Sequence, residues 1–417
     1  MNNQSDTLKD MLNGFQSLEE FAGNLHLSPI NRLKLFGYQF LIAIYQLLVL
    51  PFRKGLFLKL ESDLKKRVNL SIEIPEHNLQ AGPNNHYLSE DEIKAFQARG
   101  LTQPFRVISQ ENAKEIKELV EEAQANDFGG VNYIGADAKK AFQKHQAWGL
   151  EKSGLFQAQN ISALRNLLER PEISHRLASI LGEDVICWRN QFFVKKPGTQ
   201  GTFWHQNVAF QESSKKRKLT PTESYCLPVV QLTAWIALTD VTIENGAMRM
   251  IPGSFQDGRL EKYYEFAVNH RIDFIASLDS KLKNLVLKAA LFGSNEFIKA
   301  QAVFRGSLAQ LGNFLEDNII EDLTMRAGEA IIFTSLNMHG SYPNTSEEDT
   351  RFAFVGRFTT NSVKVFDGME RDIMATPEGY KSYSTLPLRC IQVHGKDEYG
   401  HNRILEVSTE EAIVSPC

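Results

Sequence analysis

The feature that most constrains the fold is a change of sequence period near Asp184. From there to Thr359, short segments rich in β-branched and aromatic residues alternate with proline, glycine and asparagine turn signals. The segments are DVICWRNQFFVKK, TFWHQNVAF, VVQLTAWIALTDV, GAMRMIPGS, EAIIFTSLNMHGSY and RFAFVGRFT. Many short strands with long helical additions predict a mainly β fold with helical decoration, built on a sandwich or jelly-roll core (a double-stranded β-helix of the cupin-like type).

Helices are expected before these strands. In LSEDEIKAFQARG, Ser89 can cap the helix start, Glu92 completes a capping box, and Gly100 can end the helix. A second helix should follow Ser109, with an apolar stripe made of Ala113, Ile116, Leu119 and Val120. Residues 161–181 predict another helix or a helix pair.

The chain is expected to have two parts. Residues 1–85 form a helical N-terminal region that ends in a linker, 73–87, rich in Pro, Gly and Asn. Residues 86–417 carry the strands, with insertions at about 212–227 and 259–321, the second mostly helical. Within the first part, the apolar segment 35–52 is interrupted by two glutamines and a proline, which favours a helix packed on this chain or on a dimer partner. An interfacial membrane helix and a true span are the alternatives.

Composition limits the partners and the compartment. The net charge of -4 provides no global field that would attract nucleic acid. Four widely spaced cysteines without a C-x-x-C pair indicate a reducing compartment. The N-terminus lacks the basic start and apolar core of a signal peptide. A cytoplasmic protein is therefore expected.

The chemistry-bearing residues begin with the motif His205-x-Asn207. On a strand, positions two apart face the same side, so both side chains are expected on one face. His339 ends the apolar segment EAIIFTSLNMH, and Arg351 begins the next strand, which in a jelly roll can be its neighbour. Two imidazoles and one oxygen ligand would leave open positions on an octahedral Fe(II), where a keto acid and O2 can bind. By themselves these residues favour the simpler interpretation, in which each histidine satisfies a local hydrogen bond.

Four stretches together resemble the phytanoyl-CoA dioxygenase family of Fe(II)/2-oxoglutarate oxygenases. They are LSEDEIKAFQARG, NQFFVKKPGTQGTFWHQN, VVQLTAWIALTDVTIENGAMRMIPGS and AGEAIIFTSLNMHGSYPNTSEEDTRFAFVGRF. The resemblance spans roughly residues 87–407 and makes 86–417 an oxygenase domain. Within the family, GTFWHQ, LTAWIALTD, MHGSYPN and the Arg351/Arg357 pair are most similar to the syringomycin-type chlorinating enzymes of peptide biosynthesis.

The resemblance implies roles for individual residues. It places the metal histidines at His205 and His339, the arginine that anchors oxoglutarate at Arg351, and Fe(II), 2-oxoglutarate and O2 as cofactors. Further positions are implied to line the oxoglutarate pocket: Thr202, Trp235 and Ser341. The halide and substrate side of the chlorinating enzymes is matched by Arg357 and Thr233.

Asn207 departs from the family pattern. Hydroxylases of the family carry Asp at this position, and the chlorinating enzymes carry Ala, which leaves room for chloride on the iron. Three outcomes follow for an amide. It can ligate iron and support hydroxylation, it can turn away so that chloride or water takes its place, or it can impair the site so that the protein only binds ligands.

The expected reaction is hydroxylation of an unactivated aliphatic C–H bond, with halogenation and ligand binding without catalysis as alternatives. The resemblance implies a small substrate of secondary metabolism, often an acyl or aminoacyl group tethered to a carrier protein. The basic run KKRK at 215–218 would suit an acidic acyl or peptidyl carrier protein, and a solvated loop explains it as well. The sequence does not identify the substrate.

Overall fold

The computed structural model describes residues 71–75, 79–82, 85–144, 154–199, 201–206, 218–222, 231–257, 319–376 and 379–406. Residues 1–70, the apolar segment 35–52 among them, residues 258–318 and Asn207 lie outside this set, so the predictions made for them stay predictions. The chain divides into two compact units, and nearly all described residues belong to the larger one, which comprises Leu70–Gln256, Ile320–Met374 and Lys381–Cys417. Among the described helices, none has the length and apolarity that a membrane crossing requires.

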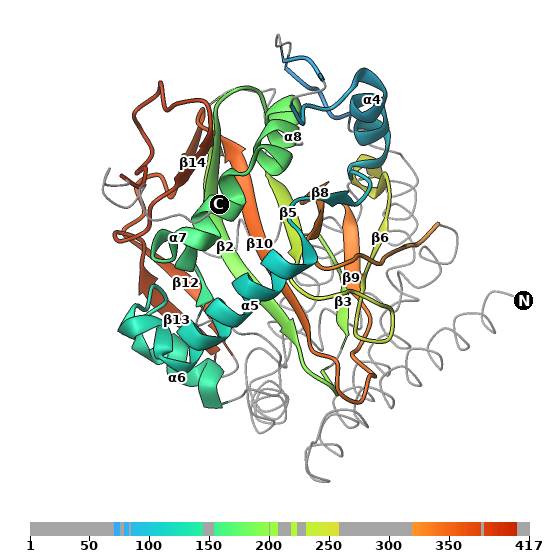
Figure 1. The fold of residues 1–417 in the computed structure, drawn as a ribbon. Coiled ribbons are helices and arrows are strands. Elements are labelled where there is room, and N and C mark those ends of the chain that lie inside the picture. The colour runs from blue at the N-terminus through green and yellow to red at the C-terminus, as the bar shows by residue number, and fades with distance from the viewer. Residues whose placement is uncertain are drawn as a thin grey trace, which may run out of the picture. The chain divides into compact units, whose positions relative to one another are not determined.

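Two antiparallel sheets form the core of the larger unit (Figure 1). The first has the order β1-β8-β5-β10-β2-β14 and the second has the order β3-β9-β6-β7. The first sheet contains β1 (Phe105–Arg106), β2 (Val185–Lys195), β5 (Leu232–Ala237), β8 (Glu329–Thr334), β10 (Arg351–Thr360) and β14 (Ile391–His394). The second contains β3 (Thr202–His205), β6 (Met248–Ile251), β7 (Glu321–Leu323) and β9 (Met338–Ser341). Two short pairs complete the strands: β4 (Leu219–Pro221) with β11 (Val363–Val365), and β12 (Arg371–Thr376) with β13 (Gly379–Ser384). The predicted jelly-roll architecture is confirmed.

Strand β10 separates two layers of the core. Phe352 and Phe354 point to one face and pack with the apolar sides of the helices. Ala353 and Val355 point to the other face, where they meet Met250 of the second sheet. Odd-numbered positions of β10 therefore face the space between the two sheets, which we call the inner face of the large sheet.

The helices begin and end largely where the sequence predicts. They are α4 (Glu90–Arg99), α5 (Gln110–Ala125), α6 (Ala136–Lys144), α7 (Ser162–Glu169) and α8 (Pro171–Leu181), with short 3-10 turns at Asp127–Gly130, Gln157–Gln159 and Ser254–Asp257. Ser89 and Glu92 form the capping box, and Gly100 ends α4 in the left-handed conformation with φ 68°. Residues 161–181 form a helix pair, because Pro171 starts a new helix. The predicted stripe of α5 is wrong at Leu119, which is exposed, whereas Ala113 and Val120 are buried.

The segment EAIIFTSLNMHGSY does not form one strand that ends at the histidine. It divides into β8 in the large sheet and β9 in the small sheet. The two strands are joined by a turn in which the backbone N–H of Asn337 donates to the Thr334 carbonyl. As a result His339 lies on β9, and this strand is not a neighbour of β10, contrary to the expectation that the strands of His339 and Arg351 pair. The two strands instead belong to opposite sheets.

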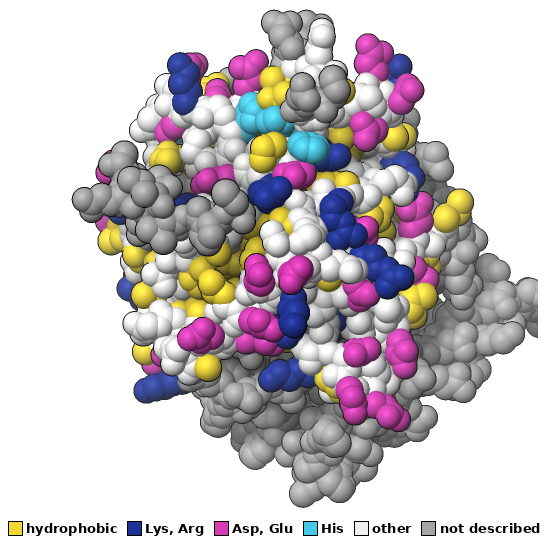
Figure 2. All heavy atoms as spheres, viewed as in Figure 1, with side chains coloured by type: hydrophobic (Ala, Val, Ile, Leu, Met, Phe, Trp, Pro, Cys, Tyr) yellow, Lys and Arg dark blue, Asp and Glu magenta, His cyan; other side chains and the backbone are white. Residues whose placement is uncertain are grey.

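The predicted linker packs against the core where it is described. Residues 71–75, 79–82 and 85–87 form neither helix nor strand, but Ile72 is buried and its carbonyl accepts a hydrogen bond from Gln97. Ile74 and Leu79 also contact the helical layer. On the surface seen in Figure 2, basic and acidic side chains of the described residues are interspersed, as the small net charge suggests.

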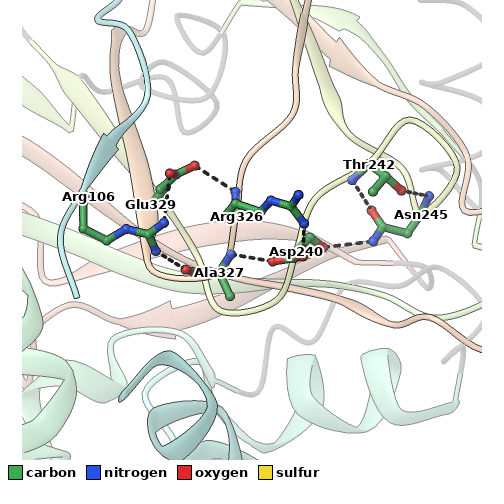
Figure 3. A network of polar contacts seen from close by, with 7 residues as sticks. All are labelled: Arg106, Asp240, Thr242, Asn245, Arg326, Ala327 and Glu329. Atoms are coloured by element: carbon green, nitrogen blue, oxygen red, sulfur yellow. Dashed lines mark hydrogen bonds and ion pairs between the residues drawn. The ribbon is translucent and has the colours of Figure 1, made fainter. Parts of the chain in front are cut away.

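A polar network stabilises the turn between β5 and β6 (Figure 3). The Asp240 carboxylate accepts from the Ala327 amide nitrogen at 2.8 Å and pairs with Arg326 at 2.9 Å. Thr242 and Asn245 exchange hydrogen bonds across the turn, and the Asn245 side chain donates to the Asp240 carbonyl. The turn leads directly into β6, so these hydrogen bonds fix the position of the chain just before that strand.

The Asp240→Asn variant should be less stable at neutral pH by up to about 1 kcal/mol, a value kept small because the carboxylate is partly exposed. The backbone hydrogen bond from Ala327, and then Arg326, lowers the pKa of Asp240. A lowered carboxyl pKa gives stability that is present at neutral pH and lost as pH falls through the folded-state pKa. Urea unfolding should therefore show a difference that shrinks in acid. The exposed Glu347→Gln serves as the control, and a difference independent of pH would contradict this role of the charge.

Candidate metal centre

Two histidines far apart in the sequence meet at the pairing of β3 with β9. His205 and His339 are direct cross-strand partners, and their ring centroids lie 4.3 Å apart with an interplanar angle of 47°. Nitrogens that bind one ion at about 2.1 Å and at a right angle lie about 3 Å apart, which rings at this separation can reach. The structure thus brings together the two residues that the sequence analysis paired.

His339 is held in the form that a metal needs. Its Nδ1 lies 2.8 Å from the Asn337 carbonyl, and because a carbonyl can only accept, Nδ1 carries the proton and Nε2 keeps its lone pair. The ring is buried and lies 5.1 Å from that of Phe333. Burial, and then the neighbouring His205, hold the pKa of His339 well below its usual value, so the imidazole is neutral.

Asn337 is a positioning residue that the sequence analysis missed. Its side chain is fully buried and donates to the Arg99 carbonyl at 2.8 Å, at the end of α4. A Cβ at Gly100 would lie 2.8 Å from this same amide nitrogen, so the glycine that ends α4 also leaves room for Asn337. In the sequence, Asn337 lies between two apolar segments, and this pattern indicates only an ordinary turn.

The third predicted ligand lies outside the described residues. Strand β3 ends at His205, and Gln206 is buried with its amide nitrogen bonded to the Leu336 carbonyl. The prediction that Asn207 shares a face with His205 therefore stays a prediction. In the described part of the chain, no group of three His, Cys, Asp or Glu side chains is placed to hold a metal.

A second feature of the inner face is the cationic group at the start of β10. Arg351 is buried, donates to the Gly246 carbonyl at 2.6 Å and lies with its guanidinium carbon 5.3 Å from the Trp235 ring centroid. Its Nε is buried and has no partner among the described residues. Burial lowers the pKa of Arg351 to about 9, so the group remains charged at neutral pH and can accept a carboxylate.

Lys195 lies opposite Arg351 in the β2–β10 register and was not predicted from the sequence. It donates to the Tyr342 carbonyl at 2.6 Å. Burial, followed by the charges of Arg351 and Arg249, lowers the pKa of Lys195 to about 6. The signal available in the sequence was its odd-numbered position on β2, which places its side chain on the inner face. Residues Arg351, Lys195 and Arg249 are called the β10-start basic residues below.

Two further predicted residues flank the histidine pair. Thr202 is the register partner of Ser341, and its amide nitrogen donates to the Ser341 hydroxyl at 3.1 Å. Ser341 is buried, whereas Thr202 is exposed. Both lie on the strands that carry the histidines, three and two positions away.

The last predicted pair lies at the other end of the inner face. Arg357 is buried and is the register partner of Thr233, which in turn pairs with Phe333. Since Phe333 touches His339, and the charge of Arg357 is among the causes that lower the pKa of His339, this end faces the histidine pair. Six strand residues, or about 20 Å of chain, separate Arg357 from Arg351.

The residues present fit an Fe(II) and 2-oxoglutarate site. A buried neutral imidazole with its tautomer fixed is a suitable metal ligand, and a second imidazole lies beside it. A buried guanidinium with an orphaned Nε suits the far carboxylate of a keto acid. Buried apolar residues, Val355 and Met250 among them, pack between the two sheets.

Titration of Lys195 should be visible in the stability of the metal-free protein. A lysine pKa of about 6 in the folded chain lies below its unfolded value of about 10.4. The unfolded chain therefore binds more protons between these values, and stability should rise with pH across that window. Lys195→Met should remove up to about 1.4 kcal/mol per pH unit from the slope. Urea midpoints between about pH 6.5 and pH 8.5 test this expectation, and identical slopes in both proteins would contradict it.

The family model of phytanoyl-CoA dioxygenase (PhyH) matches residues 96–353, more than half of the chain. No curated protein sequence matches. The structure titled "CytC3 with Fe(II) and alpha-ketoglutarate" shares the fold, with a TM-score of 0.52 and 21% identity over 77% of this chain and 93% of that chain.

Two more distant structures have TM-scores of 0.42. One is the non-heme monooxygenase ThoJ as a nickel complex, 17% identical over 75% of this chain and 87% of that chain. The other is SnoK, a non-heme alpha-ketoglutarate-dependent carbocyclase from nogalamycin biosynthesis, 19% identical over 68% and 90%. On the strength of the family match, the chain belongs to the phytanoyl-CoA dioxygenase (PhyH) family, whose enzymes are oxygenases that use Fe(II), 2-oxoglutarate and O2.

Proposed function

We propose that this oxygenase hydroxylates an unactivated aliphatic C–H bond of a small substrate in secondary metabolism. The observation that carries the proposal is the cross-strand histidine pair, with ring centroids 4.3 Å apart and His339 fixed by the Asn337 carbonyl. Two imidazoles on adjacent strands, with the rest of the coordination sphere left to small ligands, are the donor set that Fe(II) oxygenases use.

Iron would be held by His205, by Nε2 of His339 and by the amide oxygen of Asn207. When bound, the metal and the keto acid supply the oxidising chemistry. The protein supplies neutral imidazoles, and the hydrogen bond to Asn337 keeps the His339 ring from rotating. A neutral amide adds no charge to the site, and this limits how tightly it binds a hard cation.

The co-substrate would lie with its far carboxylate against the β10-start basic residues. Arg351 contributes a charged guanidinium, and the nearby Trp235 ring restricts its orientation. Thr202 and Ser341 lie on the strands that carry the histidines and would line the same pocket. The carboxylate would accept a hydrogen bond from Arg351 Nε, which has no partner among the described residues.

The substrate class follows from the resemblance to the chlorinating enzymes. It implies a small aliphatic group, either free or as an acyl or aminoacyl group tethered to a carrier protein. Of the basic run at 215–218, Lys218 alone lies among the described residues. Lys218 is not part of an exposed tip, because it is buried and forms an ion pair with Asp372 at 2.7 Å.

Halogenation is the second candidate, because Asn207 lacks the carboxylate of the hydroxylases and Arg357 supplies positive charge beside His339. Chloride would then take a coordination position that the amide leaves, with Arg357 and Thr233 on its side of the site. A protein that binds ligands without catalysis is the third.

Anaerobic addition of Fe(II) and 2-oxoglutarate should produce the visible charge-transfer absorption of the chelate. His339→Ala should abolish this absorption, because it removes a buried ligand with a fixed tautomer. His401→Ala, a histidine away from the pairing of β3 with β9, is the matched control and should retain it. Absence of the absorption in the unmodified protein would favour the ligand-binding alternative.

Two variants of Asn207 separate the reactions. Asn207→Asp should tighten Fe(II) binding and raise hydroxylation by about tenfold or more, because a charged oxygen replaces a neutral one. Asn207→Ala should lower hydroxylation. Mass spectra of products formed with bromide present provide the measurement. A halogenated product from the unmodified protein, increased in Asn207→Ala, would contradict hydroxylation as the native reaction.

A further inference from the structure

Two neutral polar side chains at the start of β5 have no hydrogen-bond partner among the described residues. Gln231 directly precedes the strand and is fully buried, and neither the nitrogen nor the oxygen of its side-chain amide is paired within that set. The hydroxyl of Thr233, two positions further on, is buried and also lacks a partner there. Three polar atoms on one short stretch of chain are therefore available to a ligand.

Gln231 is an exception among the buried amides. Every other buried Asn or Gln side chain in the described part of the chain forms at least one hydrogen bond. Gln157, for example, is equally buried, and its amide nitrogen donates to the Val131 carbonyl at 3.0 Å. Leaving a buried amide unpaired is costly, because it loses its hydrogen bonds to water and gains none. An amide kept in this state indicates a ligand that pairs with it.

The direction of these side chains follows from the alternation along β5. Trp235 and Ala237 belong to the apolar cluster between the two sheets, whereas Ala234 and Ile236 belong to the cluster on the helix side. Successive side chains of a strand point to opposite faces. Thr233, at an odd-numbered position, therefore points to the inner face of the large sheet.

Gln231 continues this face toward one of the two histidines. Its carbonyl accepts from the Ser335 backbone N–H at 3.2 Å, so the pairing of β5 with β8 extends by one residue and the side chain of Gln231 shares the inner face. The carbonyl of the next residue, Leu336, accepts from the side-chain amide of Gln206, which directly follows His205. Gln231 and the end of β3 are thus bonded to consecutive residues of one turn.

Thr233 lies beside the other histidine. It is the register partner of Phe333, whose ring centroid lies 5.1 Å from that of His339. On β10 its register partner is Arg357, at the opposite end of that strand from Arg351. The unpaired atoms therefore lie on the histidine side of the inner face, away from the arginine proposed for the co-substrate.

We propose that Gln231, assisted by Thr233, binds a carboxamide group of the primary substrate. The inference rests on the proposed oxygenase function and narrows its substrate to a small aliphatic amide. The side chain of glutamine donates through its nitrogen and accepts through its oxygen. A primary carboxamide or a lactam presents a carbonyl and an N–H on the same side, so it forms both hydrogen bonds at once. The Thr233 hydroxyl, which can donate and accept, supplies a third.

Other polar groups satisfy these atoms less completely. A carboxylate or a thioester carbonyl only accepts, so the Gln231 oxygen would face another acceptor. An ammonium group only donates, and it would leave the Gln231 nitrogen unpaired. Holding the amide at this place also fixes which carbon of the attached chain lies near the histidine pair. The same contact therefore determines where the substrate is oxidised.

Urea unfolding of the metal-free protein tests whether the Gln231 amide has a structural role instead. Gln231→Met keeps the length of the side chain and removes atoms that have no partner in the described chain, so its urea midpoint should equal or exceed that of the unmodified protein. Gln157→Met is the matched control and should lower the midpoint, because Gln157 loses its hydrogen bonds with Val131 and Asn160. A lower midpoint in Gln231→Met would overturn the proposal.

Calorimetry with three probes of equal chain length tests the chemistry of the ligand. Hexanamide should bind the metal-free protein at least about tenfold more tightly than hexanoate or hexylamine. Gln231→Met should weaken hexanamide binding about tenfold or more, and Thr233→Val, which keeps the side-chain shape, should weaken it a few-fold. The exposed Glu347→Gln is the control and should leave it unchanged.

Each alternative outcome has a defined meaning. No binding of hexanamide, equal binding of hexanoate or hexylamine, or hexanamide binding that is unchanged in Gln231→Met would overturn the proposal. The charge-transfer absorption with Fe(II) and 2-oxoglutarate should persist in Gln231→Met. Its absence from the unmodified protein would contradict the oxygenase function, whereas the hexanamide measurements need no metal and concern this site alone.

Discussion

The functional architecture depends on the pairing of β3 with β9 across His205 and His339. The two histidines are 134 residues apart in the sequence, and only the register of this short pair brings their rings to 4.3 Å. A slip of one residue would turn one of the rings to the opposite face of the small sheet. Two sets of hydrogen bonds stabilise this pairing. Asn337 links His339 to the end of α4, and the hydroxyl of the buried Ser341 accepts a hydrogen bond from the Thr202 backbone N–H.

The inner face of the large sheet supplies the second half of the site. Odd positions of β10 carry a guanidinium at each end, Arg351 and Arg357, with the small apolar Ala353 and Val355 between them. Basic residues of β2 lie beside each end, Lys195 at one and Arg189 at the other. A single strand pair thus places basic side chains at both ends of an apolar stretch. In the proposed function, the Arg351 end takes the co-substrate.

Local sequence signals predicted the helices and most strands, because a capping box, a helix-ending glycine or an alternating segment acts within a few residues. Ser89 and Gly100 are examples, and the site residues were paired by spacing and resemblance. The sequence could not reveal that residues 329–341 divide between two sheets, since this depends on pairing with distant strands. For the same reason Lys195, Arg189 and the burial of Lys218 were missed. The role of Asn207 and the structure of residues 35–52 remain predictions.

The central claim is that one Fe(II) is shared by the imidazoles of residues 205 and 339. Crystals grown without oxygen, with Fe(II) and 2-oxoglutarate, would test it by anomalous diffraction at the iron absorption edge. The account predicts one strong peak within coordination distance of Nε2 of His339 and of a ring nitrogen of His205. A peak that contacts only one of these rings, or an iron bound elsewhere in the chain, would contradict it.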